Sequence, residues 1–381
     1  MELTRQAYLK EGQRRMELLD KLMEDKGLDA VLFTSTAQQA YMLAVKYCSG
    51  YAIPTRRDFF FKERGKTAYL FVHTAGHEFH AKRESFLPAD HVIGGDCANK
   101  AVAMIGAMDT AHPRLGLYEP AEIPHSIYLK IADTGAELVD ITAYFTAARQ
   151  PKSEFELECI RSASAVAMDS FRWVVKNIRP GVTEQELVGG AEGYIRAHGG
   201  EETLVLVRST LPHTFIARPK PIPVEEDGMF LYSVEMAGQY GYWTQCIRPI
   251  FMKKDTCLEA QRILGIIHEA ENAGVEKMIP GNRVCDVAKA IEDVVAKYGL
   301  RMGVWSGHGM GADLGDGVDV GVSNTMEIVP NMILTLHPSV QSDSDGLLYG
   351  NTWLAKEGGP ENLTPDYAEC CFIDELRALV R

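Results

Sequence analysis

Three histidines in the second half of the sequence lie in patterns that could do chemistry. His308 stands between glycines in GHGMG, and glycine lets a ligand or another backbone approach closely. His213 follows a proline in LPH, and His337 ends a run of strand-forming residues in NMILTLHP. Because imidazole titrates near neutral pH, a histidine presented in this way could give or take a proton during a reaction. We therefore predict that His213, His308 and His337 are catalytic.

The helices and strands that would position these histidines lie after residue 150, where the pattern of the sequence changes. Before that point, short apolar runs such as DAVLFTS, TAYLFVHT and RLGLYE alternate with helix-like stretches. Strands that alternate with helices predict an α/β domain with a mostly parallel sheet over residues 1–150. Ser153 and Glu156 then form a capping box, which predicts that a long helix begins there.

Residues 151–381 repeat one structural plan. Pro180-Gly181 and Pro280-Gly281 are separated by 280 − 180 = 100 residues, and each lies between two helix-like stretches. Such an ungapped self-match predicts an α+β domain with an internal pseudo-twofold duplication. A cleft between the two halves is the expected place for a small ligand, and each half would supply a histidine to it.

Composition excludes several classes of partner. The net charge of −13 and the pI near 5.4 argue against nucleic acid and against an anionic membrane surface, since both require basic protein surface. No apolar run is long enough to span a bilayer, and the charged N-terminal stretch lacks the apolar region of a signal peptide. The 8 cysteines form no CxxC pair. We expect a cytoplasmic protein with reduced thiols and a small-molecule substrate.

The sequence resembles the pita-bread family of methionine aminopeptidase, prolidase, aminopeptidase P and creatinase. The resemblance rests on KSEFELECIRSASAVAMDSF, LPH, GYWTQCIRPIF, GHGMG and IVPNMILTLHPSV, and it covers nearly the whole chain. It implies a creatinase-type N-terminal domain over 1–150 and a pita-bread catalytic domain over 151–381. It also implies a homodimer in which the partner's N-terminal domain completes the site, with Arg57 of the YAIPTRRDFFF loop reaching across.

The metal ligands implied by the resemblance are mostly missing. Peptidases of the family bind two metal ions with two aspartates, one histidine and two glutamates. The matching positions here hold, in order, Val234, Gln245, His308, His337 and Gly350. Two divalent ions a few ångströms apart need bridging carboxylates. We therefore predict no dinuclear metal site, no cofactor and no peptidase activity.

Creatinase provides the family's example of catalysis without metal, and its acid/base histidine matches His213. The resemblance thus implies a hydrolase, or a lyase, that cleaves a C–N or related bond while His308 and His337 orient the substrate. Creatine itself is not expected, because creatinase's two glutamates fall on Ile247 and His337. Nearby arginines favour a small, carboxylate-bearing substrate. The candidate substrate-binding residues are Gln245, Trp243, Arg218, Arg248, Tyr349 and Arg57.

Two other functions stay open. The three candidate histidines could bind one metal ion and leave a fourth position free, as in a catalytic zinc site. Alternatively, the fold could serve as a non-catalytic small-molecule binding protein. A second histidine group, His73, His77 and His80, has the spacing of one helix face, and we interpret it as a solvated face.

Overall fold

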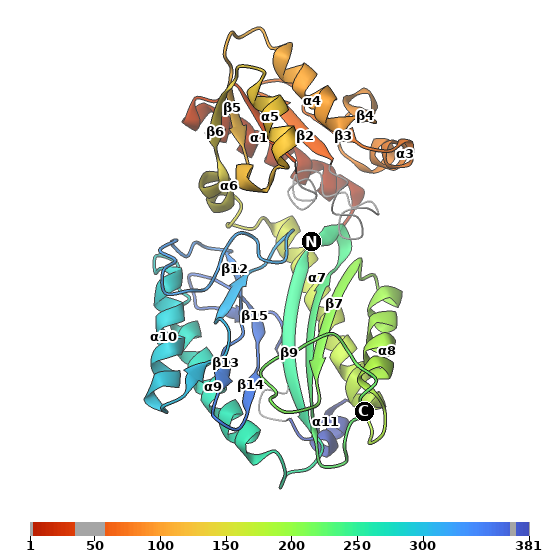
Figure 1. Ribbon diagram of the computed structural model, residues 1–381, viewed down its shortest axis with the longest axis vertical. Helices are drawn as coiled ribbons and strands as arrows, with labels where there is room; N and C mark the ends of the chain where they lie inside the picture. The colour runs from red at the N-terminus through yellow and green to blue at the C-terminus, as the bar shows by residue number, and fades with distance from the viewer. Residues whose placement is uncertain (1–2, 35–57, 366–370, 381) are drawn as a thin grey trace. The chain divides into compact units, whose positions relative to one another are not determined.

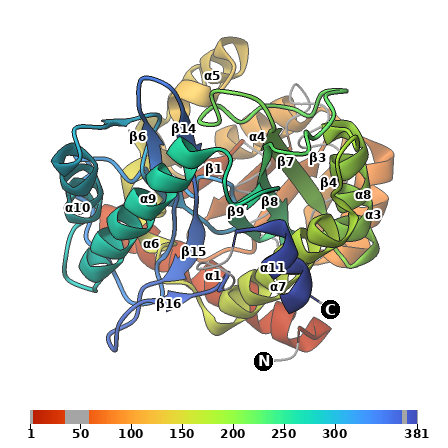
Figure 2. The same ribbon diagram turned by 90° about the horizontal axis from the view of Figure 1, so that it is seen from below.

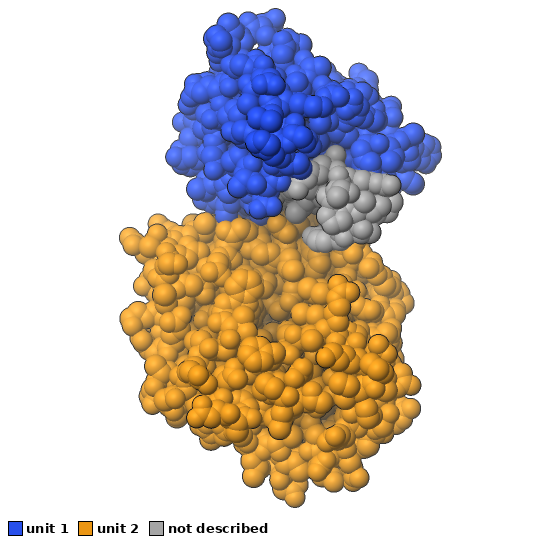
Figure 3. All heavy atoms as spheres, viewed as in Figure 1, with its two compact units in different colours: residues 1–149 blue, residues 150–381 orange. Residues whose placement is uncertain are grey.

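A computed structural model describes residues 3–34, 58–365 and 371–380 of the chain, which forms two compact units, 1–149 and 150–381 (Figure 3). Arg57 lies outside the described residues, and so does AQQAYML, one of the stretches predicted to be helical in the first domain. No helix in the described part is long and apolar enough to cross a membrane.

In the described part of the first unit, the strands form a six-stranded sheet in the order β4-β3-β2-β1-β5-β6, of which Figure 1 labels all but β1. The β1–β5, β5–β6 and β3–β4 pairs are parallel, whereas β2 runs antiparallel to both of its neighbours. The prediction of an α/β unit with a mostly parallel sheet is confirmed. The strands are β1 (Ala30–Phe33), β2 (Phe59–Glu63), β3 (Tyr69–Val72), β4 (Val92–Gly94), β5 (Arg114–Leu117) and β6 (Glu137–Asp140).

Strand β2 is a strand of this unit that the sequence analysis missed, because its first residues were assigned to a loop. Phe59, Phe60 and Phe61 are all buried, so the strand has no polar face to produce the alternating pattern of a half-exposed strand. Among the described residues of the first unit, four helices fall in stretches that were predicted to be helical: α1 (Arg5–Lys26), α3 (Ala75–Glu84), α4 (Cys97–Gly106) and α5 (His125–Ala132). Helix α6 (Thr142–Ala148) was not predicted, and 3₁₀ turns lie at Ala89–His91 and Pro120–Glu122.

The second unit repeats a pair of helices joined by a Pro-Gly turn, as predicted. The pairs are α7 (Glu154–Asn177) with α8 (Glu184–Ala197), and α9 (Leu258–Lys277) with α10 (Val284–Lys297). Gly181 and Gly281 both have positive φ angles, 87° and 95°, which residues with a side chain rarely adopt. The two turns therefore have the same structure as well as the same sequence. The predicted capping box closes the first turn of α7.

The strands of the second unit lie between the two helix pairs, as Figures 1 and 2 both show. An antiparallel sheet packs against α7 and α8 and consists of β7 (Glu202–Arg208), β8 (Met229–Ala237) and β9 (Trp243–Phe251). The second half contributes β11 (Gly307–Gly309), β12 (Ile333–Leu336), β15 (Asn351–Leu354) and β16 (Glu361–Asn362) in one sheet, and β10 (Arg301–Met302), β13 (Ser339–Gln341) and β14 (Gly346–Leu348) in another. A 3₁₀ turn, Gln239–Gly241, joins β8 to β9, and α11 (Ile373–Leu379) follows the last strand.

Alternation along β8 divides its side chains between two environments. Tyr232 and Val234 pack into the apolar core beneath α7 and α8. Leu231 belongs to the core on the opposite side of the sheet, which is shared with α9 and α10. Residues two apart in a strand point to the same side, so Glu235 faces the second half of the unit rather than its own helices.

Candidate active site

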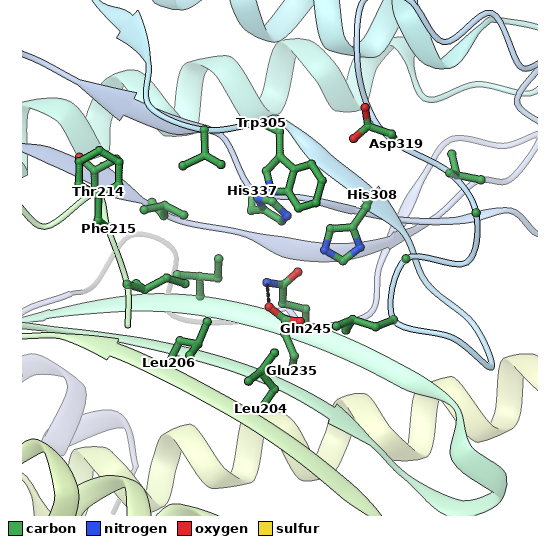
Figure 4. Close-up of a pocket in the computed structure, with 18 residues that line it drawn as sticks. Leu204, Leu206, Thr214, Phe215, Glu235, Gln245, Trp305, His308, Asp319 and His337 are labelled. Atoms are coloured by element: carbon green, nitrogen blue, oxygen red, sulfur yellow. Dashed lines mark hydrogen bonds between the residues drawn. The ribbon is translucent and has the colours of Figure 1, made fainter. Parts of the chain in front are cut away.

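A cavity of about 710 Å³ lies between the strands of the two halves of the second unit (Figure 4). Its wall is mostly apolar, with few polar side chains. The lining residues are Leu204, Leu206, Thr214, Phe215, Ile216, Glu235, Gln245, Ile247, Val304, Trp305, His308, Leu314, Gly315, Gly317, Val318, Asp319, His337 and Leu348. A concave apolar site of this size with a few convergent polar groups is the usual form of a small-molecule site.

Glu235 and Gln245 form one polar side of the cavity. They are directly opposite each other in the β8–β9 hairpin, and Nε2 of Gln245 donates a hydrogen bond to Oε1 of Glu235 at 2.9 Å (Figure 4). The amide oxygen of Gln245 is buried and has no hydrogen-bond partner among the described residues. Glu235 is only 8% exposed, and burial raises its pKa to about 7. This carboxyl group can therefore exchange a proton near neutral pH.

His308 and His337 form the facing side, with Trp305 beside them (Figure 4). The two imidazole centres are 5.1 Å apart, and their planes are inclined at 64°. Burial lowers the pKa of both rings; for His337 burial and then the charge of His308 lower it to about 3. Both rings are therefore neutral at physiological pH.

Hydrogen bonding distinguishes the two imidazoles. Nδ1 of His308 lies 2.9 Å from the carbonyl oxygen of Gly309. Because a carbonyl only accepts, this nitrogen carries the proton, and Nε2 of His308 is left as an acceptor. His337 is buried, and neither of its ring nitrogens has a hydrogen-bond partner among the described residues. A buried polar group without a protein partner in a cavity is a natural contact point for a ligand.

His213 lies in the loop after β7 and does not line the cavity, although the next residue, Thr214, does. Its backbone N–H donates to Oδ1 of Asp345 at 2.9 Å, and its Nδ1 lies 2.9 Å from Oδ2. Burial raises the pKa of Asp345, but the hydrogen bonds from His213 outweigh burial and leave the pKa lowered. The carboxylate thus fixes His213 with Nδ1 protonated. The expectation that the structure would bring three histidines together is wrong for this residue.

Arg248 was predicted to bind substrate, but it has a structural role. The guanidinium donates to the carbonyl oxygens of Ile247, Gly350 and Thr364 and to the side-chain oxygen of Asn351, at 2.6–3.0 Å. The side chain is 1% exposed and does not line the cavity. A buried guanidinium needs many acceptors, and these carbonyls supply them.

Of the predicted substrate-binding residues that the structure describes, Gln245 alone lines the cavity. Tyr349 is buried beneath the guanidinium of Arg248, 4.6 Å from ring centre to guanidinium carbon. Trp243 is buried at the start of β9, and Arg218 is exposed on a loop. Neither lysine nor arginine lines the cavity in the described part of the chain. The expectation of an arginine-lined pocket for an anion is therefore wrong for the residues that can be placed.

Glu235 is a buried, titratable residue of the cavity that the sequence analysis missed. The family motif directed attention to Val234, one residue earlier, whose side chain faces the helices. Two signals were available: Glu235 is the one charged residue in β8, and hairpin pairing places it opposite Gln245. Asp319 and Trp305, close to GHGMG in sequence, also line the cavity and were not predicted.

Comparison with known proteins agrees with this architecture. The model of the creatinase/prolidase N-terminal domain matches residues 15–150, and that of metallopeptidase family M24 matches residues 158–358. The chain belongs to metallopeptidase family M24. The family resemblance inferred from the motifs and the pita-bread fold of the second unit are confirmed.

The similar proteins and solved structures are distant from this chain in sequence. "Uncharacterized peptidase YqhT" of Bacillus subtilis is 23% identical over 371 residues, covering 94% of this chain and 100% of that protein. The prolidase of Pyrococcus horikoshii superimposes with a TM-score of 0.77 at 20% identity, covering 92% of this chain and 98% of that one. The N-terminal domain of the FACT complex subunit SPT16 from chickpea gives 0.71 at 13% identity, covering 96% and 99%.

The side chains in the cavity do not fit a two-metal centre. Of the positions that the motifs matched to the family ligands, Val234 faces the helix core, so Glu235 holds the cavity-facing place opposite Gln245, and Gly350 has no side chain. A Cβ on Gly350 would lie 2.5 Å from Cβ of His337, so no ligand can be added there without moving that histidine. Among the described residues, no three histidine, cysteine or carboxylate groups of the cavity bring ligand atoms within 4.8 Å of one another. A pair of bridged ions requires such a cluster.

We predict that Gly350→Ala destabilises the protein by about 1–3 kcal/mol, because the new methyl group overpacks the contact with His337. Urea unfolding monitored by circular dichroism measures the change. Gly265→Ala is the matched control, since nothing lies within 4 Å of its added Cβ on helix α9. That variant should be as stable as the parent or slightly more stable, as alanine favours helix. Equal stability of the two variants would contradict the tight contact.

Proposed function

We propose that this M24 protein is a metal-independent hydrolase that cleaves a non-peptide C–N bond in a small, largely apolar substrate. Membership of the family supports a hydrolase. The donor set of the cavity supports independence from metal, because it offers one buried carboxylate where two bridged ions would need several. The apolar wall and the volume of about 710 Å³ support a small substrate with an apolar body.

One observation carries the proposal: Glu235 is a buried carboxyl group with a pKa of about 7, placed across a mostly apolar cavity from two neutral imidazoles. A general acid/base is most effective when its pKa is close to the working pH. Neutral imidazoles can donate an N–H to a developing negative charge without adding a cation to the cavity. The arrangement therefore supplies both proton transfer and charge stabilisation.

The proposed reaction uses these groups in sequence. Ionised Glu235 takes a proton from water, and the water oxygen bonds to the electrophilic carbon. An N–H of His337 stabilises the negative oxygen that develops there. The C–N bond then breaks with its electron pair on nitrogen, and Glu235 returns the proton to that nitrogen. Gln245 keeps the carboxyl group oriented through its hydrogen bond.

His213 takes a supporting role in this proposal. The Asp345 carboxylate holds it, and it fixes the loop whose next two residues, Thr214 and Phe215, line the cavity. The prediction from sequence that His213 itself transfers the proton remains a competing hypothesis, and variants of Glu235 and His213 distinguish the two. A carboxylate-bearing substrate also remains a prediction, without a cationic side chain to favour it among the described lining residues.

A second candidate function is small-molecule binding without turnover. One structural neighbour, SPT16, is described as a subunit of a complex rather than as a peptidase, and this favours the possibility that the fold can serve without hydrolysis. A ligand that binds the wild-type cavity in calorimetry but releases no amine or acid over hours would support this alternative.

We predict that Glu235→Gln lowers kcat about 10²- to 10⁴-fold and changes KM much less, because it removes the proton-transferring group and keeps the side-chain shape. Amine release from a panel of small amides, ureas and N-acyl compounds identifies the substrate and then measures the loss. Glu276→Gln, on the exposed side of α9, is the control and should keep full activity. Retained turnover in Glu235→Gln together with its loss in His213→Gln would assign the proton transfer to His213.

The same carboxyl group should make stability depend on pH. Its pKa rises from 4.5 to about 7 on folding, so the folded protein binds the proton more tightly than the unfolded chain does. Wild-type stability relative to Glu235→Gln should fall as pH rises from about 4.5 to 7 and level off above that, with a total change up to roughly 3 kcal/mol. Urea unfolding at several pH values measures the difference. A flat difference across this range would show that Glu235 is not the buried acid described here.

We predict that turnover persists after exhaustive treatment with a strong chelator, since the reaction proposed for the cavity uses no metal ion. Activity with and without chelator, and after adding back Mn²⁺, Co²⁺ or Zn²⁺, is the direct measurement. Loss of activity in chelator that one of these ions restores would refute metal independence and favour a mononuclear metal enzyme.

A further inference from the structure

Three potential metal ligands converge in the first unit, far along the sequence from the cavity residues. Asp58 immediately precedes β2, and His73 immediately follows β3. The two strands are antiparallel neighbours, with Phe59 opposite Phe71, so the start of one and the end of the other meet. Helix α3 begins two residues later and places His77 in its first turn. Strand pairing and the start of one helix thus bring the three side chains to one place.

The geometry is that of a compact donor cluster. One ligand atom from each of Asp58, His73 and His77 lies within 4.8 Å of the other two. Asp58 is 2% and His77 6% exposed, and the imidazole rings are 4.9 Å apart at 77°. Oδ1 of Asp58 accepts from the backbone N–H of His73 at 3.0 Å, which fixes the carboxylate beside the ring. Nε2 of His73 is buried and has no hydrogen-bond partner among the described residues.

The burial of His77 corrects the interpretation from sequence that this histidine group is a solvated helix face. Only His80, three residues further along α3, is exposed in the way that interpretation requires, with 58% of its side chain accessible. A solvated face needs no convergence of ligand atoms. The structure instead separates one exposed histidine from two that turn inward beside an aspartate.

The chemistry of these donors selects a class of ion. Two imidazoles and one carboxylate are typical ligands of borderline divalent metals such as Zn²⁺ and Co²⁺, and water commonly fills the fourth coordination position. Ligand atoms around tetrahedral zinc are about 3.4 Å apart, so closing on an ion requires movements of about 1 Å, within the reach of small side-chain rotations. Hard cations such as Ca²⁺ and Mg²⁺ prefer all-oxygen sites and fit this set poorly.

We propose that Asp58, His73 and His77 form a binding site for one divalent transition-metal ion in the first unit. The ion joins β2, β3 and α3, and none of its ligands lines the cavity of the second unit. The site is independent of the proposed hydrolase function. Bound metal stabilises the first unit, because an ion that binds the folded state alone raises its stability.

The test uses the full chain, stripped with chelator and titrated with Zn²⁺ by calorimetry and with Co²⁺ by visible absorbance. Wild-type protein should bind one equivalent, and added Zn²⁺ should raise its Tm. His77→Gln and His73→Gln should each weaken Zn²⁺ binding more than about tenfold and abolish the Tm shift. His80→Gln is the matched control on the same helix and should bind as wild type does.

Two further measurements keep the result decisive. Circular dichroism of the metal-free proteins identifies any variant that fails to fold, and the other histidine variant then carries the test. His308→Gln locates the ion, since it should leave binding unchanged. Absence of Zn²⁺ binding in wild type, full binding in both folded ligand variants, or loss of binding in His308→Gln would each overturn the proposal.

Discussion

The candidate site depends on one buried cation, the guanidinium of Arg248. From β9 it donates hydrogen bonds to the carbonyl oxygens of Ile247, in the β7-β8-β9 sheet, and of Gly350, which immediately precedes β15. These two residues lie on the two sides of the junction between the halves of the second unit. Backbone hydrogen bonds between Ile247 and Gly350 reinforce the same junction. This contact sets the face carrying Glu235 and Gln245 opposite the face carrying His308 and His337. A lysine could not replace it, because one ammonium group cannot reach several acceptors in a plane.

The close contact between Gly350 and His337 links this junction to the cavity residues. With no side chain at this position, His337 can approach the β15 segment closely and enter the cavity. The motifs match this glycine to a position where the family resemblance implies a carboxylate ligand, and any side chain placed here would collide with His337. The buried carboxyl group of the cavity, that of Glu235, faces neutral rings and apolar side chains, and burial in this environment raises its pKa.

The sequence predicts most of the fold because its signals are local. Capping boxes, Pro-Gly turns and the duplicated helix pair depend on residues close together in the chain, and they are found as expected. The site is harder to predict because side-chain direction depends on register. A shift of one residue along β8 exchanges Val234 for Glu235 and reverses which side of the sheet is polar. Arg248 was misassigned because most of its acceptors are backbone carbonyls, which leave no trace in the sequence. Strand β2 was missed because burial on both faces removes the alternating pattern.

This chain contains two sets of residues that each combine one carboxylate with two histidines. Comparing them shows why residue type alone does not define a metal site. In the cavity, Glu235 lies across open space from His308 and His337, and the three do not approach the spacing that an ion requires. In the first unit, Asp58, His73 and His77 satisfy that spacing. The difference arises from the backbone: the cavity groups come from opposing sheets held apart by apolar side chains, whereas the others come from paired strand ends and the helix that follows directly. Opposing sheets leave a mostly apolar cavity in which the buried carboxyl group can hold a proton, and adjacent strand ends favour convergence of ligand atoms on a cation.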